Sequence, residues 1–529
     1  MGHAGAWRLW VIAQVLLSVA SSAFADQPRP AGRHASAPPS AASLLTAGRQ
    51  YLRADDLDNA RASFQASLER DPTSAQAYYL LGLVAERRKD LPDAAALFAN
   101  AIRYAPAMAE AHDRRGFVLG QMGDTAGALG EFAHAAQLAP ALFDAQYHLG
   151  ATRWWTKDLD GALPALRAAV ALRPRHAEAR YYLGLTLEAL GQPGPGLLSL
   201  REAVRLNPRL AAAQSRLGVA LQARGDLEEA IRHLRAAVDL DPSAADWQNS
   251  LALALSQSGR GDESVAILKA LVEAQPGYVP ARVNLGTALM QQGNLGEAAA
   301  AYRAVLERDP SNAEASYNLG VALKQMDEFT EAETHLRKAV ELDRALPEAA
   351  FTLGVVLWQT GRPGEALQQL REAIRRKPDY AQAHYIVGTI LKQQGSVADA
   401  LAEFRTAVKY DPASPEAHLS LGQALEQAGQ DTAAAAELAE ADRLTRKAAA
   451  AQASTFAVGV GKEKLKAGDD AGAIEQFREA VRLAAENPQA HYQLALALQH
   501  AGASAEAKIH FAEARRLAPY LQPSGHDKP

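Results

Sequence analysis

Residues 285–310 read LGTALMQQGNLGEAAAAYRAVLERDP, and the spacing within this stretch decides the fold. Gly286 and Ala298 have almost no side chain, so two helix backbones that meet there can pack closely, while Tyr302 fills the adjoining space. Pro310 has no amide hydrogen and clashes with the preceding turn, so it ends the second helix. The stretch therefore predicts two closely packed helices followed by a break.

This spacing recurs with a period of 34 residues along a chain of 529 residues. If each repeat starts seven residues before its glycine, the chain holds fourteen repeats, which begin at residues 41, 75, 109, 143, 177, 211, 245, 279, 313, 347, 381, 415, 454 and 488. Position 8 is glycine in twelve repeats, position 20 is alanine in twelve, and position 32 is proline in eleven. Such a period is typical of stacked helical pairs, here called helix A and helix B of each repeat.

The pattern resembles the tetratricopeptide repeat (TPR) family, in which Leu-Gly, a large apolar residue, Ala, an aromatic residue and Pro stand at fixed offsets. Repeat 8 carries the pattern at Leu285, Gly286, Leu289, Ala298, Tyr302 and Pro310, and departs from it at Arg282, where the first aromatic residue would stand. The resemblance implies an all-α fold, a right-handed superhelical solenoid of about 14 tetratricopeptide helix-turn-helix repeats. It also implies that helix A lines the concave inner wall.

The first 25 residues are typical of a secretory signal peptide. Arg8 precedes an apolar run over residues 9–20, and small residues at 23 and 25 suit cleavage. The run is shorter than the roughly 20 apolar residues that span a bilayer, so we expect no stable membrane insertion after cleavage, with a retained anchor as the alternative. We therefore expect an exported bacterial protein, periplasmic or extracellular, whose residues 26–40 form a Pro/Ala/Ser-rich linker.

The register breaks between Gly422 and Gly461, which are 39 residues apart. Residues 432–456 contain neither proline nor glycine, so helix B of repeat 12 is expected to continue into repeat 13, with a loop insertion as the alternative. Five extra residues turn the face that follows by roughly 140° beyond a full turn. We divide the chain into repeats 1–12 (41–448), an inserted helical junction (449–453), repeats 13 and 14 (454–521) and a tail (522–529).

The last repeat is not followed by a polar capping helix, which such arrays generally need. Either its open end is tolerated, or another chain covers it. Self-association through repeat 14 is therefore an expectation of the sequence.

The composition argues against catalysis. Cysteine is absent, which excludes thiol catalysis and cysteine metal sites. Histidines recur at position 4 of four repeats, which indicates packing rather than metal binding. They are His112, His384, His418 and His491. Repeats fill residues 41–521, so we expect no catalytic domain, no metal and no cofactor. Removal of the first 25 residues takes away one of 55 basic residues and none of 60 acidic ones, and the resulting net charge of −6 gives no reason to expect nucleic acid as a partner.

Positions 2, 6, 9 and 13 of helix A lie within about 60° of one another and form one stripe, which should face the groove. Position 13 is glutamine in six successive repeats, 7 to 12. These residues are Gln257, Gln291, Gln325, Gln359, Gln393 and Gln427. Asn284 and Asn318 stand at position 6 of repeats 8 and 9. Amides both donate and accept, so this row can bind the backbone of an extended peptide; the alternative is that glutamine is simply a good exposed helix former.

Three tryptophans are further candidates. Trp154 and Trp155 occupy positions 12 and 13 of repeat 4, and Trp358 occupies position 12 of repeat 10. They either anchor a partner or pack across to the next helix. We interpret the chain as a non-catalytic protein–protein interaction scaffold that binds peptide or protein partners along its groove. The alternative is a scaffold for envelope polysaccharide synthesis or export, in which the tryptophans stack on carbohydrate.

Overall fold

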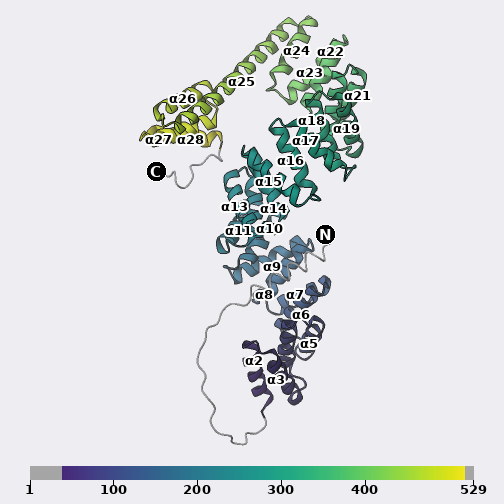
Figure 1. The fold of residues 1–529 in the computed structure, drawn as a ribbon, viewed down its shortest axis with the longest axis vertical. Helices are drawn as coiled ribbons and strands as arrows, with labels where there is room; N and C mark the ends of the chain where they lie inside the picture. Colours follow the sequence, from purple (N-terminus) through teal and green to yellow (C-terminus); the bar gives the residue numbers. More distant parts are fainter. Residues whose placement is uncertain (1–38, 519–529) are drawn as a thin grey trace. The chain divides into compact units, whose positions relative to one another are not determined.

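The computed structural model of the protein describes residues 39–518. Within this range the chain forms 27 helices and no strand, which confirms an all-α repeat solenoid (Figure 1). The expected signal peptide (1–25), most of the linker (26–40) and the tail (522–529) lie outside the described residues.

Each helix A covers positions 1 to 13 of its repeat, and each helix B begins about four residues later. The A helices are α2 (Ala41–Arg53), α4 (Ala75–Arg87), α6 (Ala109–Gln121), α8 (Phe143–Trp155), α10 (Ala177–Ala189), α12 (Ala211–Ala223), α14 (Ala245–Gln257), α16 (Val279–Gln291), α18 (Ala313–Gln325), α20 (Pro347–Gln359), α22 (Ala381–Gln393), α24 (Pro415–Gln427) and α27 (Pro488–His500). The B helices are α3 (Leu57–Arg70), α5 (Leu91–Tyr104), α7 (Thr125–Leu138), α9 (Leu159–Leu172), α11 (Pro193–Leu206), α13 (Leu227–Leu240), α15 (Gly261–Ala274), α17 (Leu295–Leu306), α19 (Phe329–Leu342), α21 (Pro363–Arg376), α23 (Val397–Tyr410), α26 (Asp470–Leu483) and α28 (Ser504–Leu517).

The repeats fall into two compact units. Unit 1 comprises Met1–Arg224 and Glu229–Ser243, and unit 2 comprises Gly225–Glu228 and Ala244–Pro529. Unit 1 thus holds repeats 1 to 6 apart from five residues, and unit 2 holds repeats 7 to 14.

Glycine at position 8 permits the close approach of the two helices within a repeat. A Cβ atom placed on Gly320 would lie 2.6 Å from Cγ of Leu336, the residue at position 24. A Cβ atom on Gly116 would lie 2.8 Å from Cε1 of Phe132, again at position 24. Real Cβ atoms do not tolerate such distances, so any larger residue here must push helix A away from helix B.

Histidines at position 4 join several repeats to the one before them. In His384, Nε2 lies 3.0 Å from the carbonyl oxygen of Pro378, at position 32 of the preceding repeat, and Nδ1 lies 2.6 Å from a carboxylate oxygen of Glu403. Both neighbours are acceptors, so the imidazolium form satisfies them best. His112 and His418 make the same two contacts. The structure therefore gives these histidines a packing role, because each contacts the carbonyl of the proline that follows the preceding helix B.

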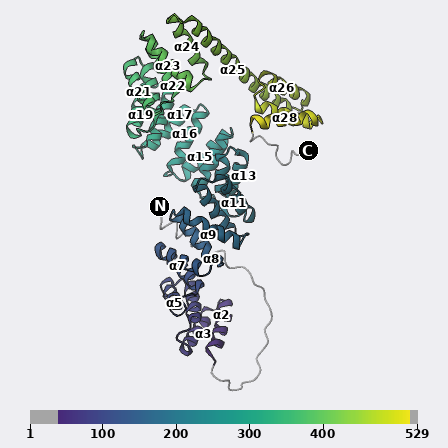
Figure 2. The ribbon, with the colours of Figure 1, turned by 180° about the vertical axis from the view of Figure 1, so that it is seen from behind.

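The long helix α25 (Asp431–Lys466) replaces helix B of repeat 12 and helix A of repeat 13. It contains 36 residues, including the five at 449–453, and is seen from both sides in Figures 1 and 2. Position 3 of most repeats is an alanine buried against the preceding helix B, as at Ala315 and Ala383. In repeat 13 this position is Phe456, which is 74% exposed, because the preceding helix B is part of the same straight helix and cannot pack against it.

Ion pairs connect successive B helices from position 25 of one repeat to position 19 of the next. They join Arg201 to Glu229, Lys269 to Glu297, Arg303 to Glu331, Arg337 to Glu365 and Arg478 to Glu506, at 2.7 to 3.0 Å. Such exposed pairs contribute little individually, but they recur at the same two positions and connect successive B helices.

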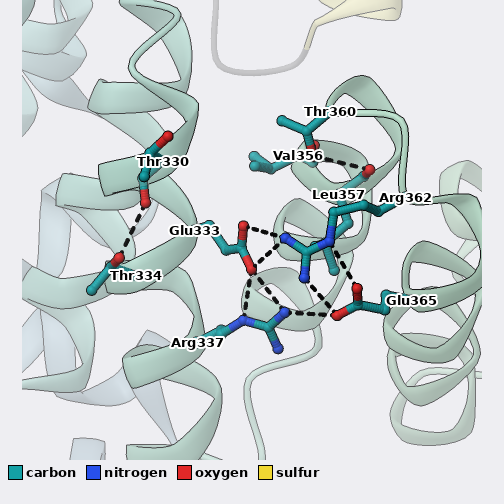
Figure 3. A network of polar contacts seen from close by, with 9 residues as sticks. All are labelled: Thr330, Glu333, Thr334, Arg337, Val356, Leu357, Thr360, Arg362 and Glu365. Carbon is teal, nitrogen blue, oxygen red and sulfur yellow. Dashed lines mark hydrogen bonds and ion pairs between the residues drawn. The ribbon is translucent and has the colours of Figure 1, made fainter.

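One of these pairs belongs to a closed network between α19 and the start of α21 (Figure 3). Glu333 accepts hydrogen bonds from Arg337 at 2.9 Å and from Arg362 at 2.7 Å, and both arginines also donate to Glu365. Burial raises the pKa of Glu333, but the bonds from the two arginines outweigh burial and hold the pKa below its usual range. Repeats 9 and 10 are thus joined partly by charge.

Candidate binding face on the A helices

The A helices form the closely spaced side of the stack in unit 2. Successive A helices from α14 to α24 contact one another, whereas no two successive B helices of residues 244–518 approach one another as extensively. The side on which helices crowd together is the inner side of a curved stack. The A-helix face of unit 2 is therefore the candidate binding face.

The six glutamines form a continuous exposed row on this face. Each is the last residue of its A helix, and all six are exposed. Gln291 accepts a hydrogen bond from Oγ of Ser256 at 2.6 Å, and Gln393 accepts one from Nε1 of Trp358 at 3.1 Å. Three other glutamines of the row have no hydrogen-bond partner within residues 39–518, namely Gln325, Gln359 and Gln427.

The two asparagines behave differently from each other. Asn284 is half-buried and donates from Nδ2 to Oδ1 of Asn249 in the preceding repeat at 2.8 Å. Asn318 is also half-buried, but in the described part of the chain its amide makes no hydrogen bond. Only Asn318 therefore keeps its full bonding capacity for a partner.

The tryptophans pack between repeats. Trp154 and Trp155 meet edge to face with ring centroids 5.2 Å apart, and Trp154 also lies 5.6 Å from the ring of Tyr182 in the next repeat. Both are half-buried against the core of repeats 4 and 5. Trp358 is half-buried against the core of repeats 9 to 12 and donates to Gln393. The three indoles thus have neighbours within the chain, as the packing alternative requires.

Unit 1 carries charged pairs where unit 2 carries amides. Nδ1 of His148 lies 2.8 Å from Oδ1 of Asp113, and both side chains are buried. These are position 6 of one repeat and position 5 of the preceding one, the same positions as Asn284 and Asn249. The backbone therefore brings the same two positions together in both units.

Position 12 of a repeat also meets position 6 of the next repeat in unit 1. Arg114 donates to Glu86 at 3.4 Å, and Arg216 donates to Glu188 at 2.7 Å. Burial raises the pKa of Glu86, Arg114 opposes the rise, and Asp113 adds to it. Sequence reasoning missed these pairs, although opposite charges 28 residues apart at positions 12 and 6 were a usable sign.

No helix within residues 39–518 combines the length and apolar character needed to cross a membrane. In the same range, no three histidine, aspartate or glutamate side chains gather in a way that could hold a metal ion.

Comparison with known families agrees with this architecture. The family described as "Tetratricopeptide repeat" matches residues 45–109, 156–211, 192–244, 215–279, 283–350, 322–381, 351–405 and 461–521, and the one described as "TPR repeat" matches residues 388–429. These ranges cover more than half of the chain. The protein therefore belongs to the tetratricopeptide repeat family.

Solved structures share the repeat over short lengths. MamA of Desulfovibrio magneticus RS-1 is 28% identical over 32% of this chain and 96% of its own, with a TM-score of 0.30. YrrB, described as a TPR protein with an unusual peptide-binding site, is 25% identical over 33% of this chain and 89% of its own, with a TM-score of 0.30. PilF of Pseudomonas aeruginosa is 21% identical over 39% of this chain and 94% of its own, with a TM-score of 0.36. Scores this low carry no functional argument, and no curated protein shows significant similarity to the sequence.

Proposed function

We propose that this protein is a non-catalytic scaffold that binds an extended segment of a partner protein along the A helices of repeats 7 to 12. The observation that carries this proposal is the row of six exposed glutamines at the ends of six successive A helices. Proteins of the tetratricopeptide repeat family act as protein-interaction scaffolds, which supports the general role.

The geometry of helix A explains how the row can act on a bound chain. Side chains on a helix tilt toward its N-terminus, so glutamines at position 13 lean back over the middle of the A-helix face. Each amide offers one acceptor and two donors, which match the carbonyl and N–H groups of an extended backbone without regard to side chains. The three glutamines without a partner supply this capacity at no cost to contacts between repeats.

A selection experiment tests the proposal. Random 12-residue peptides are selected on the full chain, and the enriched peptides are measured by fluorescence anisotropy. The Gln325→Ala, Gln359→Ala, Gln427→Ala triple variant should bind them at least tenfold more weakly, the loss expected from about three net hydrogen bonds.

The matched control removes three exposed glutamines from B helices instead, by Gln65→Ala, Gln137→Ala and Gln368→Ala. This variant should bind as the unchanged chain does. Equal affinities of the two triple variants, or a selection that enriches no peptide, would contradict the proposal.

We also propose that the protein works after export from a bacterial cytoplasm. The support is the character of residues 1–25 alone, with their apolar run and small residues before the expected cleavage point. N-terminal sequencing of the protein recovered from a cell envelope fraction should begin near residue 26; a start at Met1 in a cytoplasmic fraction would contradict export. The polysaccharide alternative has no specific observation in its favour, because the tryptophans on which it depends pack within the chain.

A further inference from the structure

Carboxylates without ion-pair partners mark one edge of the binding face in unit 2. Glu314, Glu348 and Glu416 stand at position 2 of repeats 9, 10 and 12, in the first turn of their A helices. None of them forms an ion pair with any other residue of the described chain. On the B helices of the same repeats, by contrast, Glu331, Glu333 and Glu365 are all paired with arginine.

An acidic first turn also stabilises a helix by itself, through the helix dipole, so the position alone is not decisive. Unit 1 contains an acidic residue at position 2 that is paired with a cation of the same repeat. Asp144, at position 2 of repeat 4, lies 3.4 Å from Arg173, at position 31 of the same repeat. Position 31 is Asp343 in repeat 9 and Thr445 in repeat 12, so Glu314 and Glu416 have no equivalent cation.

Repeat 10 does have a cation at position 31, but that cation takes another neighbour. Nζ of Lys377 lies 4.9 Å from the ring centroid of Tyr380, and it forms no ion pair with Glu348 within residues 39–518. The chain thus places one of its own lysines over an aromatic ring at this edge.

Aromatic residues accompany the carboxylates. Position 5 is three residues after position 2 and therefore lies on the same helix face. It is half-buried Tyr317 in repeat 9, Phe351 in repeat 10 and Tyr385 in repeat 11, and the rings of Phe351 and Tyr380 lie 4.9 Å apart. A ring beside a carboxylate suits a lysine or arginine, whose stem packs on the ring while its head meets the charge.

A hollow of about 410 Å³ lies where α22, α23 and α24 meet. Its polar lining includes Tyr385, Asp411, Ser414 and Glu416, and neither carboxylate is in an ion pair within the described residues. The hollow combines an aromatic ring with two carboxylates, one of which, Glu416, accepts a hydrogen bond from Oγ of Ser414 at 3.1 Å. It is therefore suited to a basic side chain.

The spacing of the repeats sets the spacing of the ligand. Packed helices lie about 8–10 Å apart, and a polyproline II segment rises 3.1 Å per residue with three residues per turn. Every third side chain of such a segment therefore points the same way and advances by about one repeat. A segment that crosses the A helices between positions 6 and 9 lies about 8 Å from position 2, within reach of a long basic side chain.

We infer that unit 2 recognises an extended basic peptide whose lysine or arginine side chains, at residues i, i+3 and i+9, meet Glu314, Glu348 and Glu416. The skipped place at i+6 corresponds to Gln382, which occupies position 2 of repeat 11. The inference rests on the proposed function, because it names the chemistry of the peptide that the glutamine row holds. Lys324 and Lys392 stand at position 12, across the path of the peptide from position 2, and Nζ of Lys392 donates to Oε1 of Gln423 at 3.0 Å.

Four 13-residue fluorescent peptides test this inference against the full chain by anisotropy. The first carries lysine at residues 2, 5 and 11; the second carries glutamate there; the third carries glutamine; the fourth carries three lysines at residues 2, 3 and 4. The first peptide should bind tightest, and its affinity should fall as salt rises. The glutamate and glutamine peptides should bind at least tenfold more weakly.

The protein is then changed at the three carboxylates by Glu314→Gln, Glu348→Gln and Glu416→Gln. Affinity for the first peptide should fall roughly tenfold, the loss expected from three exposed ion pairs. The matched control is Glu273→Gln, Glu307→Gln and Glu341→Gln, which changes net charge equally at exposed positions at the ends of B helices, and it should bind within about twofold of the unchanged chain.

The inference is overturned if the glutamine or glutamate peptide binds as tightly as the first, if the clustered-lysine peptide binds as tightly, or if the two charge variants bind alike. Its failure is separable from failure of the proposed function. Selected peptides that are not basic but lose affinity in the glutamine-to-alanine variant would leave the scaffold proposal standing. If the first peptide still binds the glutamine-to-alanine variant but no longer binds the carboxylate variant, the preference for basic peptides would stand and the role of the glutamine row would be rejected.

Discussion

Units 1 and 2 make the same contacts between A helices with different chemistry. Position 5 of one repeat meets position 6 of the next as buried Asp113 and His148 in unit 1, and as the amides Asn249 and Asn284 in unit 2. The two contacts join residues 35 apart in both cases, so the repeat geometry is shared. The packing rules evidently constrain where these side chains lie but not what they are.

Position 12 extends the comparison. In unit 1 the glutamates at this position pair with arginines of the next repeat, as Glu188 does with Arg216. In unit 2 the same position carries Ser256 and Trp358, which donate to single oxygens of Gln291 and Gln393. At this position unit 1 thus pairs opposite charges across repeats, whereas unit 2 uses neutral hydrogen bonds. Within the described residues of unit 2, Glu314, Glu348 and Glu416 have no ion-pair partner.

The largest effect should come from the packing that the two units share. We expect Gly116→Leu in unit 1 and Gly320→Leu in unit 2 each to destabilise their own repeat by about 3 kcal/mol or more, because the new side chain collides with position 24 of helix B. Hydrogen exchange measured along the chain should show lost protection in repeats 3 and 9 respectively. A marked difference between the two variants would break the assumption of a common geometry.

The next largest effect should separate the units. Asp113→Ala removes the carboxylate that lies against buried His148 and leaves a ring nitrogen without a partner, which should cost about 2 to 3 kcal/mol. Asn249→Ala removes a neutral hydrogen bond at the same position and should cost about 1 kcal/mol. Denaturant unfolding followed by the local tryptophans, Trp154 and Trp155 in unit 1 and Trp247 and Trp358 in unit 2, provides the measurement. Equal losses of stability in the two variants would show that the two contacts do not differ in strength.

Acidification should change the stability of two repeats in opposite directions. Burial lowers the pKa of His233 in repeat 6, where its ring faces the amide oxygen of Gln214. Burial alone would also lower the pKa of His384 in repeat 11, but its bonds to Glu403 and Pro378 outweigh burial and raise the pKa. The pKa of histidine in an unfolded chain is about 6.5.

The signs follow from linkage between protonation and folding. The lowered pKa of His233 contributes stability that is present above the unfolded pKa and is lost as pH falls. The raised pKa of His384 contributes stability that is present below the unfolded pKa and is lost as pH rises. When the pH is lowered from 7.5 to 5.5, hydrogen-exchange protection factors should therefore fall in repeat 6 and rise in repeat 11. The rise should vanish in His384→Gln; if it persists there, another group is responsible.

The smallest effect concerns the B helices, where the units should not differ. Arg201 pairs with Glu229 in unit 1 as Arg303 pairs with Glu331 in unit 2, and all four side chains are substantially exposed. Arg201→Ala and Arg303→Ala should each cost about 0.5 kcal/mol at low salt and less at high salt. A large loss in only one of them would show that the difference between units extends beyond the A helices.

The helices and their contacts within repeats could be predicted from sequence because every signal was local. Gly286, Ala298 and Pro310 lie within 25 residues and together predict where the two helices pack closely and where the repeat ends. The glutamine row could also be found, since one register places all six at position 13. The division of the row could not be predicted, because only the structure shows that Gln291 and Gln393 accept hydrogen bonds from the preceding repeat while Gln359 does not.

The sequence alone determined the repeat itself: small residues where backbones meet, a large residue beside them, and a break every 34 residues, because close packing admits few alternatives at those positions. Only the tertiary structure decided which polar groups neutralise one another. Contacts such as Asp113 to His148 join residues 35 apart, and stacking alone brings them together. Whether Glu348 is paired with Lys377 depends on the direction a lysine takes among several neighbours, which no spacing in the sequence specifies.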